Sequence, residues 1–172
     1  MARETGLGEE TGPEMPDWKL KLAECMPLFG HRNWIVVADS AYPAQSSAGI
    51  ETVFAPIGQI EAVEEVADAI ASSRHVRALV HLDRELALVA ESDAPGVDEY
   101  RHQLEDVLNG AQVDRTPHEE TIARLDQSAR VFRVLIVKTQ MTIPYTSVFF
   151  ELDCRYWSAE AEQRLRQAMQ AQ

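Results

Sequence analysis

Two side chains that can bind a ligand or move a proton stand at either end of one apolar run. The run is Ile-Val-Val-Ala at residues 35–38, with His31 shortly before it and Asp39 directly after it. Histidine titrates near neutral pH and suits acid or base catalysis, whereas a carboxylate accepts hydrogen bonds from ligand hydroxyls. The apolar run predicts a strand buried on both faces. Such a strand needs neither residue, so we interpret both as candidates for a functional site.

Ordinary structural roles are the alternative for each candidate. His31 could cap the end of a short helix, and Asp39 could cap a turn. His118 could be a surface residue in the first turn of a helix, and Tyr145, after Pro144, could pack within a loop. Taken singly, none of these residues identifies a site.

The segment His-Leu-Asp-Arg-Glu at residues 81–85 raises the question of a metal site. It places His81, Asp83 and Glu85 at alternating positions, which share one face if the segment is a strand. Three such side chains can hold a metal ion. Alternating charge is also typical of a solvated strand face, and no fourth ligand is evident. We favour the solvated face and predict no metal.

Composition and charge exclude several classes of function. The chain has 172 residues, 45% hydrophobic and 26% charged, which suits one soluble domain. The net charge of -12 opposes nucleic acid binding, and no apolar run approaches the ~20 residues of a membrane span. No Gly-rich phosphate loop or Gly-x-Ser-x-Gly elbow is present, so we predict no cofactor.

The polar, acidic residues 1–15 do not resemble a secretory signal. We expect a flexible tail there, one domain over residues 16–172, and a cytoplasmic protein.

Helical and strand-like segments alternate along the chain. We expect helices at residues 17–26, 59–73, 95–108, 116–125 and from Ser158, and strands at residues 33–38, 75–82, 131–139 and 147–153, with shorter strands possible at 52–55 and 84–89. This order predicts a single-domain α/β fold, with helices on both faces of a mixed or mainly parallel sheet. Ligands of such sheets bind beyond the carboxyl ends of the strands, where Asp39 stands.

The helix predicted from residue 116 has a clear start. Thr116, Pro117 and Glu119 form a capping-box pattern, in which the threonine hydroxyl accepts from the backbone three residues on. The pattern predicts that His118 lies in the first helical turn.

Three segments together resemble the ribose pyranase and fucose mutarotase family (RbsD/FucU-like). They are FGHRNWIVVADSAYPAQ at 29–45, PHEETIARL at 117–125 and VLIVKTQMTIPYTSVFFEL at 134–152. They follow in the family's order with fitting spacings, over roughly residues 17–153. By this resemblance His31 matches the family's catalytic acid and Asp39 a ligand of sugar hydroxyls. His118 matches a second sugar-contacting residue, Tyr145 matches the Tyr of a Tyr-x-Asn motif, and Ser147 stands at the Asn of that motif.

The resemblance also implies a fold, an activity and an assembly. The family has a three-layer fold and interconverts sugar ring forms and anomers without metal or nucleotide. It forms ring-shaped homo-oligomers, decamers in known cases, with sites between neighbouring subunits. We therefore expect a cofactor-free isomerase, a mutarotase or pyranase that acts on a monosaccharide by general acid and base catalysis.

The chain departs from the family motifs at three positions. Ser147 replaces Asn, Gln140 replaces Gly, and Met141 replaces Glu. Ser147 keeps a hydroxyl but reaches less far, and Met141 removes a carboxylate. These changes leave open a second hypothesis, a non-catalytic monosaccharide-binding and ring-forming protein on the same scaffold.

Overall fold

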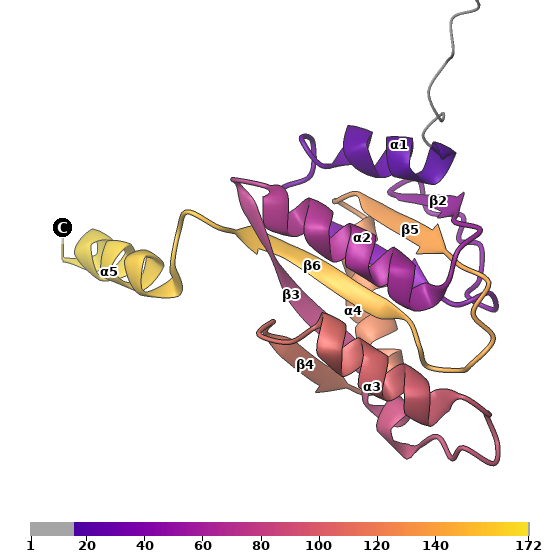
Figure 1. Ribbon diagram of the computed structural model, residues 1–172. Helices are drawn as coiled ribbons and strands as arrows, with labels where there is room; N and C mark the ends of the chain where they lie inside the picture. Colours follow the sequence, from indigo (N-terminus) through magenta and orange to yellow (C-terminus); the bar gives the residue numbers. More distant parts are fainter. Residues whose placement is uncertain (1–15, 172) are drawn as a thin grey trace, which may run out of the picture.

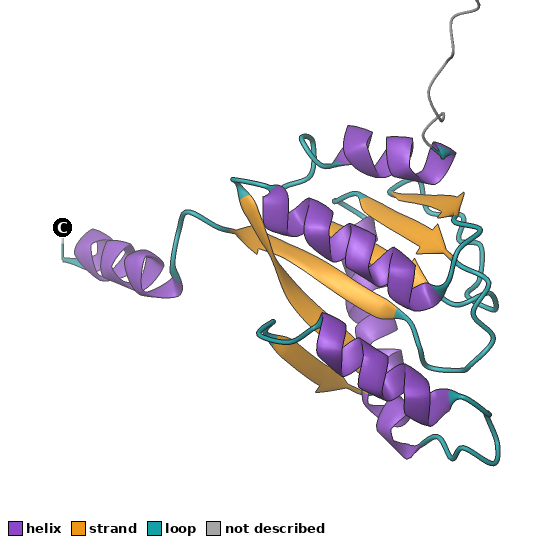
Figure 2. Ribbon diagram, in the orientation of Figure 1, coloured by secondary structure: helices purple, strands orange, loops and turns teal. Residues whose placement is uncertain are grey.

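The computed structural model describes residues 16–171, so the tail predicted at 1–15 lies outside the described residues. Six strands form one sheet in the order β2-β5-β1-β6-β3-β4 (Figures 1 and 2). They are β1 (Trp34–Ala38), β2 (Ile50–Phe54), β3 (Val76–Asp83), β4 (Val113–Thr116), β5 (Val134–Lys138) and β6 (Val148–Cys154). Five strands run parallel, and β6 runs antiparallel between β1 and β3. The predicted α/β fold with a mixed sheet is confirmed.

Helices cover both faces of this sheet. The covering helices are α1 (Asp17–Cys25), α2 (Gln59–Ser72), α3 (Val97–Val107) and α4 (His118–Ala129), and a fifth helix, α5 (Ala159–Gln170), lies outside these layers. Helices α1, α2 and α3 lie on one face and α4 on the other, which makes three layers (Figure 1). Within residues 16–171, no helix is long and apolar enough to cross a lipid bilayer.

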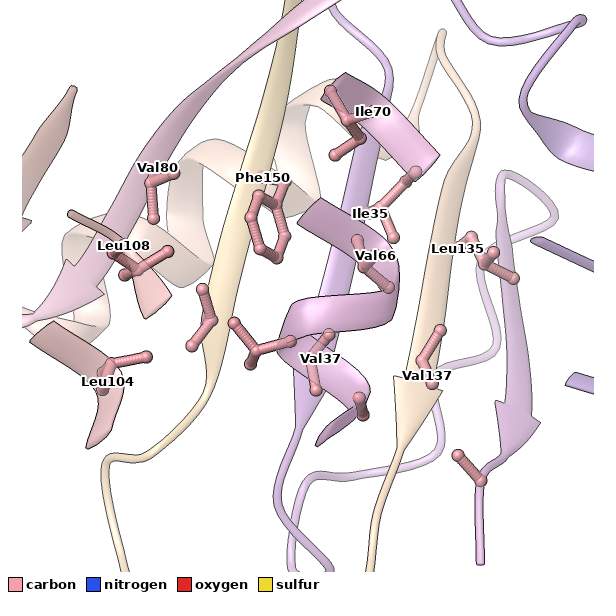
Figure 3. Close-up of a cluster of buried hydrophobic side chains, with 14 of the residues drawn as sticks. Ile35, Val37, Val66, Ile70, Val80, Leu104, Leu108, Leu135, Val137 and Phe150 are labelled. Atoms are coloured by element: carbon pink, nitrogen blue, oxygen red, sulfur yellow. The ribbon is translucent and has the colours of Figure 1, made fainter. Parts of the chain in front are cut away.

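The alternation of side chains along β1 explains why its apolar run has no polar interruption. Ile35 and Val37 pack into the larger core beneath α1, α2 and α3, together with Phe150 of β6 (Figure 3). Trp34, Val36 and Ala38 face the smaller core beneath α4. A central strand with helices on both sides must be apolar at every position, as the sequence predicted for residues 35–38.

Two elements differ from the sequence predictions. Residues 84–89 do not form a strand, because Arg84–Leu88 is a short 3₁₀ helix, η1. The Arg101 guanidinium donates to the carbonyl oxygens of Leu86 (2.8 Å) and Val89 (3.0 Å), which therefore need no neighbouring strand. Strand β4 (Val113–Thr116) was not predicted, because this short edge strand is mostly polar.

The strand directions define two edges of the sheet. The carboxyl edge contains the residues that follow β1, β3, β4 and β5 and those that precede β6. The amino edge contains the residues before β1 and β3 and the end of β6. Helix α5 continues from the amino edge and projects away from the sheet (Figure 1).

Candidate functional site

A cleft of about 280 Å³ at the carboxyl edge is lined by three predicted site residues, Asp39, His118 and Tyr145. A fourth, Ser147, lies next to it and bonds Asp39. Asp39 follows β1, His118 begins α4 after β4, and Tyr145 and Ser147 precede β6. The cleft is lined by Asp39, Ala41, Tyr42, Pro43, Gln45, His118, Ile122, Pro144 and Tyr145. It is small, and its apolar wall surrounds a few polar groups, as in many small-molecule sites.

The carboxylate of Asp39 is held in place by two donors. The backbone N–H of Ala41 donates to its Oδ1 (2.9 Å), and the Ser147 hydroxyl donates to its Oδ2 (3.2 Å). Ser147 is buried, so its hydroxyl supports the carboxylate from behind the cleft. Each carboxylate oxygen keeps further acceptor capacity for a ligand hydroxyl.

The imidazole of His118 is oriented by a buried carboxylate. Its Nδ1 lies 2.8 Å from Oδ2 of Asp83, the last residue of β3, which is only 2% exposed. Burial raises the pKa of Asp83 to about 6, although the hydrogen bond and positive charge of His118 act in the opposite direction. Because Nδ1 is engaged, Nε2 is the ring nitrogen available to a ligand in the cleft.

The start of α4 is capped from another element. The helix begins at His118 and Thr116 makes no capping bond, so the predicted capping box is wrong. Thr116 instead bonds the hydroxyl of Thr121 (2.7 Å). The Glu85 carboxylate accepts from the backbone N–H of His118 at 3.0 and 3.1 Å. His118 therefore does lie in the first turn, fixed by both its side chain and its backbone.

Tyr145 occupies a constrained turn at the mouth of the cleft. Its φ of 60° lies in the left-handed region, which non-glycine residues rarely adopt. The next carbonyl, that of Thr146, accepts from the Tyr100 hydroxyl (2.7 Å) and the Gln59 side-chain amide (2.9 Å), both buried. The turn sets the Tyr145 ring edge-on to His118, with ring centroids 5.7 Å apart. Backbone strain held by buried hydrogen bonds is typical of a functional loop.

His31 does not reach this cleft within the chain. It precedes β1 at the amino edge, and the five residues of β1 alone separate the two edges by roughly 16 Å. Its Nδ1 lies 3.0 Å from Oδ1 of Asp153, whose Oδ2 accepts two bonds from Arg77. The side chain of His31 is 55% exposed. Within a single chain, strand β1 therefore keeps His31 and Asp39 apart, and they do not line one pocket.

The segment 81–85 contains residues that the sequence analysis set aside. His81 and Asp83 are buried, so the predicted solvated face is wrong. The three side chains have separate partners, since His81 bonds Glu151 (2.9 Å), Asp83 bonds His118 and Glu85 caps α4. Within the described part of the chain, no cluster of three His, Cys, Asp or Glu side chains could hold a metal ion.

Three further residues differ in their relation to the cleft: Met141 and Gln140 lie outside it, and Tyr42 lines it. Met141 packs against the larger core and Gln140 is exposed, so neither lines the cleft. Tyr42 does line it and was not predicted; its hydroxyl is buried without a hydrogen-bond partner, and burial raises the pKa of this phenol.

The chain is an α/β protein with a small, largely apolar cleft at the carboxyl edge of its sheet, in which a carboxylate and an imidazole lie. Residues 19–154 match the profile of the RbsD / FucU transport protein family. The chain belongs to this family. No protein with a curated description is significantly similar in sequence.

Solved structures of similar fold include three that this chain matches over almost all of their length. They are Bacillus subtilis RbsD complexed with D-ribose (17% identity, TM-score 0.55, covering 88% of this chain and 98% of that one), FucU from Bifidobacterium longum (16%, 0.54, 81% and 98%) and the fucose mutarotase from Streptococcus pneumoniae in complex with L-fucose (18%, 0.53, 82% and 97%). At these identities the likeness shows the fold.

Proposed function

We propose that the protein is a cofactor-free monosaccharide mutarotase or pyranase, which interconverts ring forms or anomers of an aldose. The observation that carries this proposal is the pair formed by the anchored Asp39 carboxylate and the Asp83-oriented imidazole of His118 in one small cleft. Two similar structures are described with ribose and fucose bound, which supports a sugar as the ligand.

Ring opening of an aldose requires two proton movements and no redox partner. The anomeric hydroxyl loses a proton as its oxygen becomes a carbonyl, the bond from C1 to the ring oxygen breaks, and the ring oxygen gains a proton. The aldehyde then closes again on its other face or through another hydroxyl. Positioned acid and base groups accelerate such steps by ~10²–10⁴-fold.

The cleft residues fit the accepting and orienting roles. Nε2 of His118 accepts the anomeric proton, and the Asp83 carboxylate stabilises the imidazolium that results. Asp39 accepts hydrogen bonds from sugar hydroxyls and fixes the pose. Tyr145 offers a ring face and a hydroxyl at the cleft mouth, and Ser147 acts through Asp39. Holding the sugar in one orientation lowers the entropic part of the barrier.

The donating role belongs to His31, which must then come from a second copy of the chain. His31 lies at the opposite edge of the sheet from its own Asp39, so only another subunit can bring an imidazole of this kind to the cleft. We therefore propose that the active form is a homo-oligomer, a ring such as a decamer, with sites between subunits.

Sugar binding without catalysis is the second candidate function. It is favoured by Met141, which packs in the core where the family motif has a carboxylate. In that case the cleft still binds a monosaccharide through Asp39 and His118, but anomers exchange at the rate seen in buffer.

Saturation-transfer NMR of a panel of pentoses and hexoses, including ribose and fucose, tests the proposal. We expect accelerated exchange for at least one aldose, reduced by roughly 10²-fold or more in His31→Ala and Asp39→Asn. The control is His102→Ala on the exposed surface of α3, which should exchange as the wild type does. Binding without exchange would favour the second function, and neither binding nor exchange would refute both.

A further inference from the structure

The chain continues past the family domain as an ordered extension that buries none of its helical residues against the described part of the chain. The family match ends at residue 154, and residues 155–171 form a connector and α5. Ser158 caps the helix by accepting from the Ala161 N–H (3.1 Å), and the Trp157 indole donates to Glu162 (2.9 Å). No residue of α5 is buried.

The extension carries several exposed apolar side chains. Tyr156, Trp157, Leu165 and Met169 are all exposed. In α5, residues 161, 165, 168 and 169 form an apolar stripe, and the opposite side carries Gln163 and Gln167. An isolated helix of 12 residues is marginal in water, so its stability must come from a surface that covers the stripe.

The first residues of the extension lie beside His31. His31, Arg77, Asp153, Tyr156 and Trp157 all line one cleft at the amino edge. Asp153 contacts both His31 and Arg77 and is followed four residues later by Trp157. A subunit contact that receives His31 therefore has Trp157 at its side.

The geometry points to a second copy of this chain as the partner of the extension. We propose that residues 155–171 dock on the subunit whose Asp39 cleft receives His31, and that Trp157 becomes an aromatic wall of that sugar site. This inference rests on the function proposed above, because that function places His31 in the cleft of another copy. The cleft fits an apolar partner, since Ala41, Pro43, Ile122, Pro144 and Tyr145 line it.

An indole suits this position chemically. One face of a pyranose or furanose presents C–H groups, and a large rigid aromatic ring covers such a face at little cost in conformational entropy. Tryptophan is also among the residues most enriched at the binding hot spots of protein interfaces. The cleft of a single chain supplies a carboxylate, an imidazole and Tyr145 but leaves the sugar open on the side toward solvent.

Tryptophan fluorescence can test the docking directly. The chain has three tryptophans, and Trp18 (1% exposed) and Trp34 (2%) are buried, whereas Trp157 is 44% exposed. Acrylamide therefore reaches Trp157 in a free subunit. In the assembled protein we expect it to be shielded, so that quenching equals that of Trp157→Phe. The variant Leu165→Glu/Met169→Glu should restore quenching, whereas Gln163→Glu/Gln167→Glu adds the same charge on the other side of α5 and should not.

The same residue can be tested in the sugar site. A sugar that the protein converts should change the emission of the wild type but not that of Trp157→Phe. Trp157→Ala should raise the KM for anomer exchange roughly three- to tenfold, and Trp157→Phe should restore most of the loss.

The two proposals can fail separately. A monomer by analytical ultracentrifugation, or an assembly in which acrylamide quenches Trp157 as freely as in the α5 variant, would overturn the docking. His31-dependent exchange with an unshielded Trp157 would refute this inference and leave the proposed function standing. A shielded Trp157 in a protein without exchange would refute the proposed chemistry and leave the docking.

Discussion

His118 and Asp83 are joined by a 2.8 Å hydrogen bond between the imidazole Nδ1 and a carboxylate that is almost completely buried. The bond fixes the ring orientation and, in the proposed reaction, stabilises the imidazolium. Asp83 comes from the end of β3 and His118 from the start of α4, so the pair depends on the sheet having β3 beside β4.

Asp83→Asn should separate orientation from charge. Asn keeps the size of the side chain and a hydrogen-bonding group but provides no negative charge for an imidazolium. We expect the kcat for anomer exchange to fall by roughly 10²-fold with KM little changed, measured by saturation-transfer NMR. Thermal unfolding serves as the control for folding. A variant that exchanges anomers at the wild-type rate would show that Asp83 has a structural role only.

The titration of Asp83 should also make the free energy of unfolding depend on pH. The pKa of Asp83 is raised to about 6, mainly by burial, whereas an aspartate in the unfolded chain titrates near ~3.9. Between these values the folded protein holds a proton that the unfolded chain has released, so the free energy of unfolding falls as pH rises.

Urea unfolding at a series of pH values can measure this term. Relative to Asp83→Asn, the wild type should lose up to about 3 kcal/mol of unfolding free energy between roughly pH 4 and pH 7, and the difference should be constant above that range. A difference that does not vary with pH would mean that Asp83 titrates as it does in the unfolded chain.

Mixed oligomers can reveal whether sites are shared between subunits. His31→Ala and Asp39→Asn are each expected to be inactive alone. If His31 serves the cleft of another copy, a site is complete when an Asp39→Asn subunit gives its histidine to a His31→Ala subunit. Random assembly of equal amounts makes about a quarter of the sites complete, so about a quarter of wild-type exchange should return. A mixture that stays inactive would contradict the shared site.

Ser147 is expected to influence which sugar is preferred. Its buried hydroxyl supports Asp39, and the longer amide of Asn would reach past that carboxylate into the cleft. Ser147→Asn should change the ratio of kcat/KM between two aldoses by roughly three- to tenfold. Equal ratios in the two proteins would show that this position does not affect specificity.

The central strands β1 and β5 were predictable because nearly all of their residues are buried. The run at 35–38 is apolar on both faces, and the helical stripe that includes Val63, Val66 and Ile70 faces the larger core. Strand β4 and the 3₁₀ turn after β3 were not predicted, because each is fixed by contacts with distant residues. Arg101, for example, binds the carbonyls of Leu86 and Val89 from α3.

The candidate site was predictable where residues follow strand ends. Asp39 and Tyr145 reach one cleft because parallel strands and the start of antiparallel β6 meet at the same edge. Asp83 was missed because its alternation with His81 also fits a solvated strand, and only α4 packing over that face buries them. The role of His31 stays a prediction, because the length of β1 separates it from Asp39 within one chain and a single chain does not show which residues of a second copy lie near it.

The order of strands also determines when the chain can fold. The central strand β1 pairs with β5 and β6, whose first residues are Val134 and Val148, so both partners are synthesised long after residues 34–38. At typical synthesis rates roughly 5–20 s pass before β5 emerges, and an apolar Trp-Ile-Val-Val-Ala strand has no partner during that time. Sheets that depend on such distant pairings fold slowly. A nascent chain that stops before residue 134 therefore exposes an unpaired apolar strand, and we expect chaperone binding to concentrate on β1.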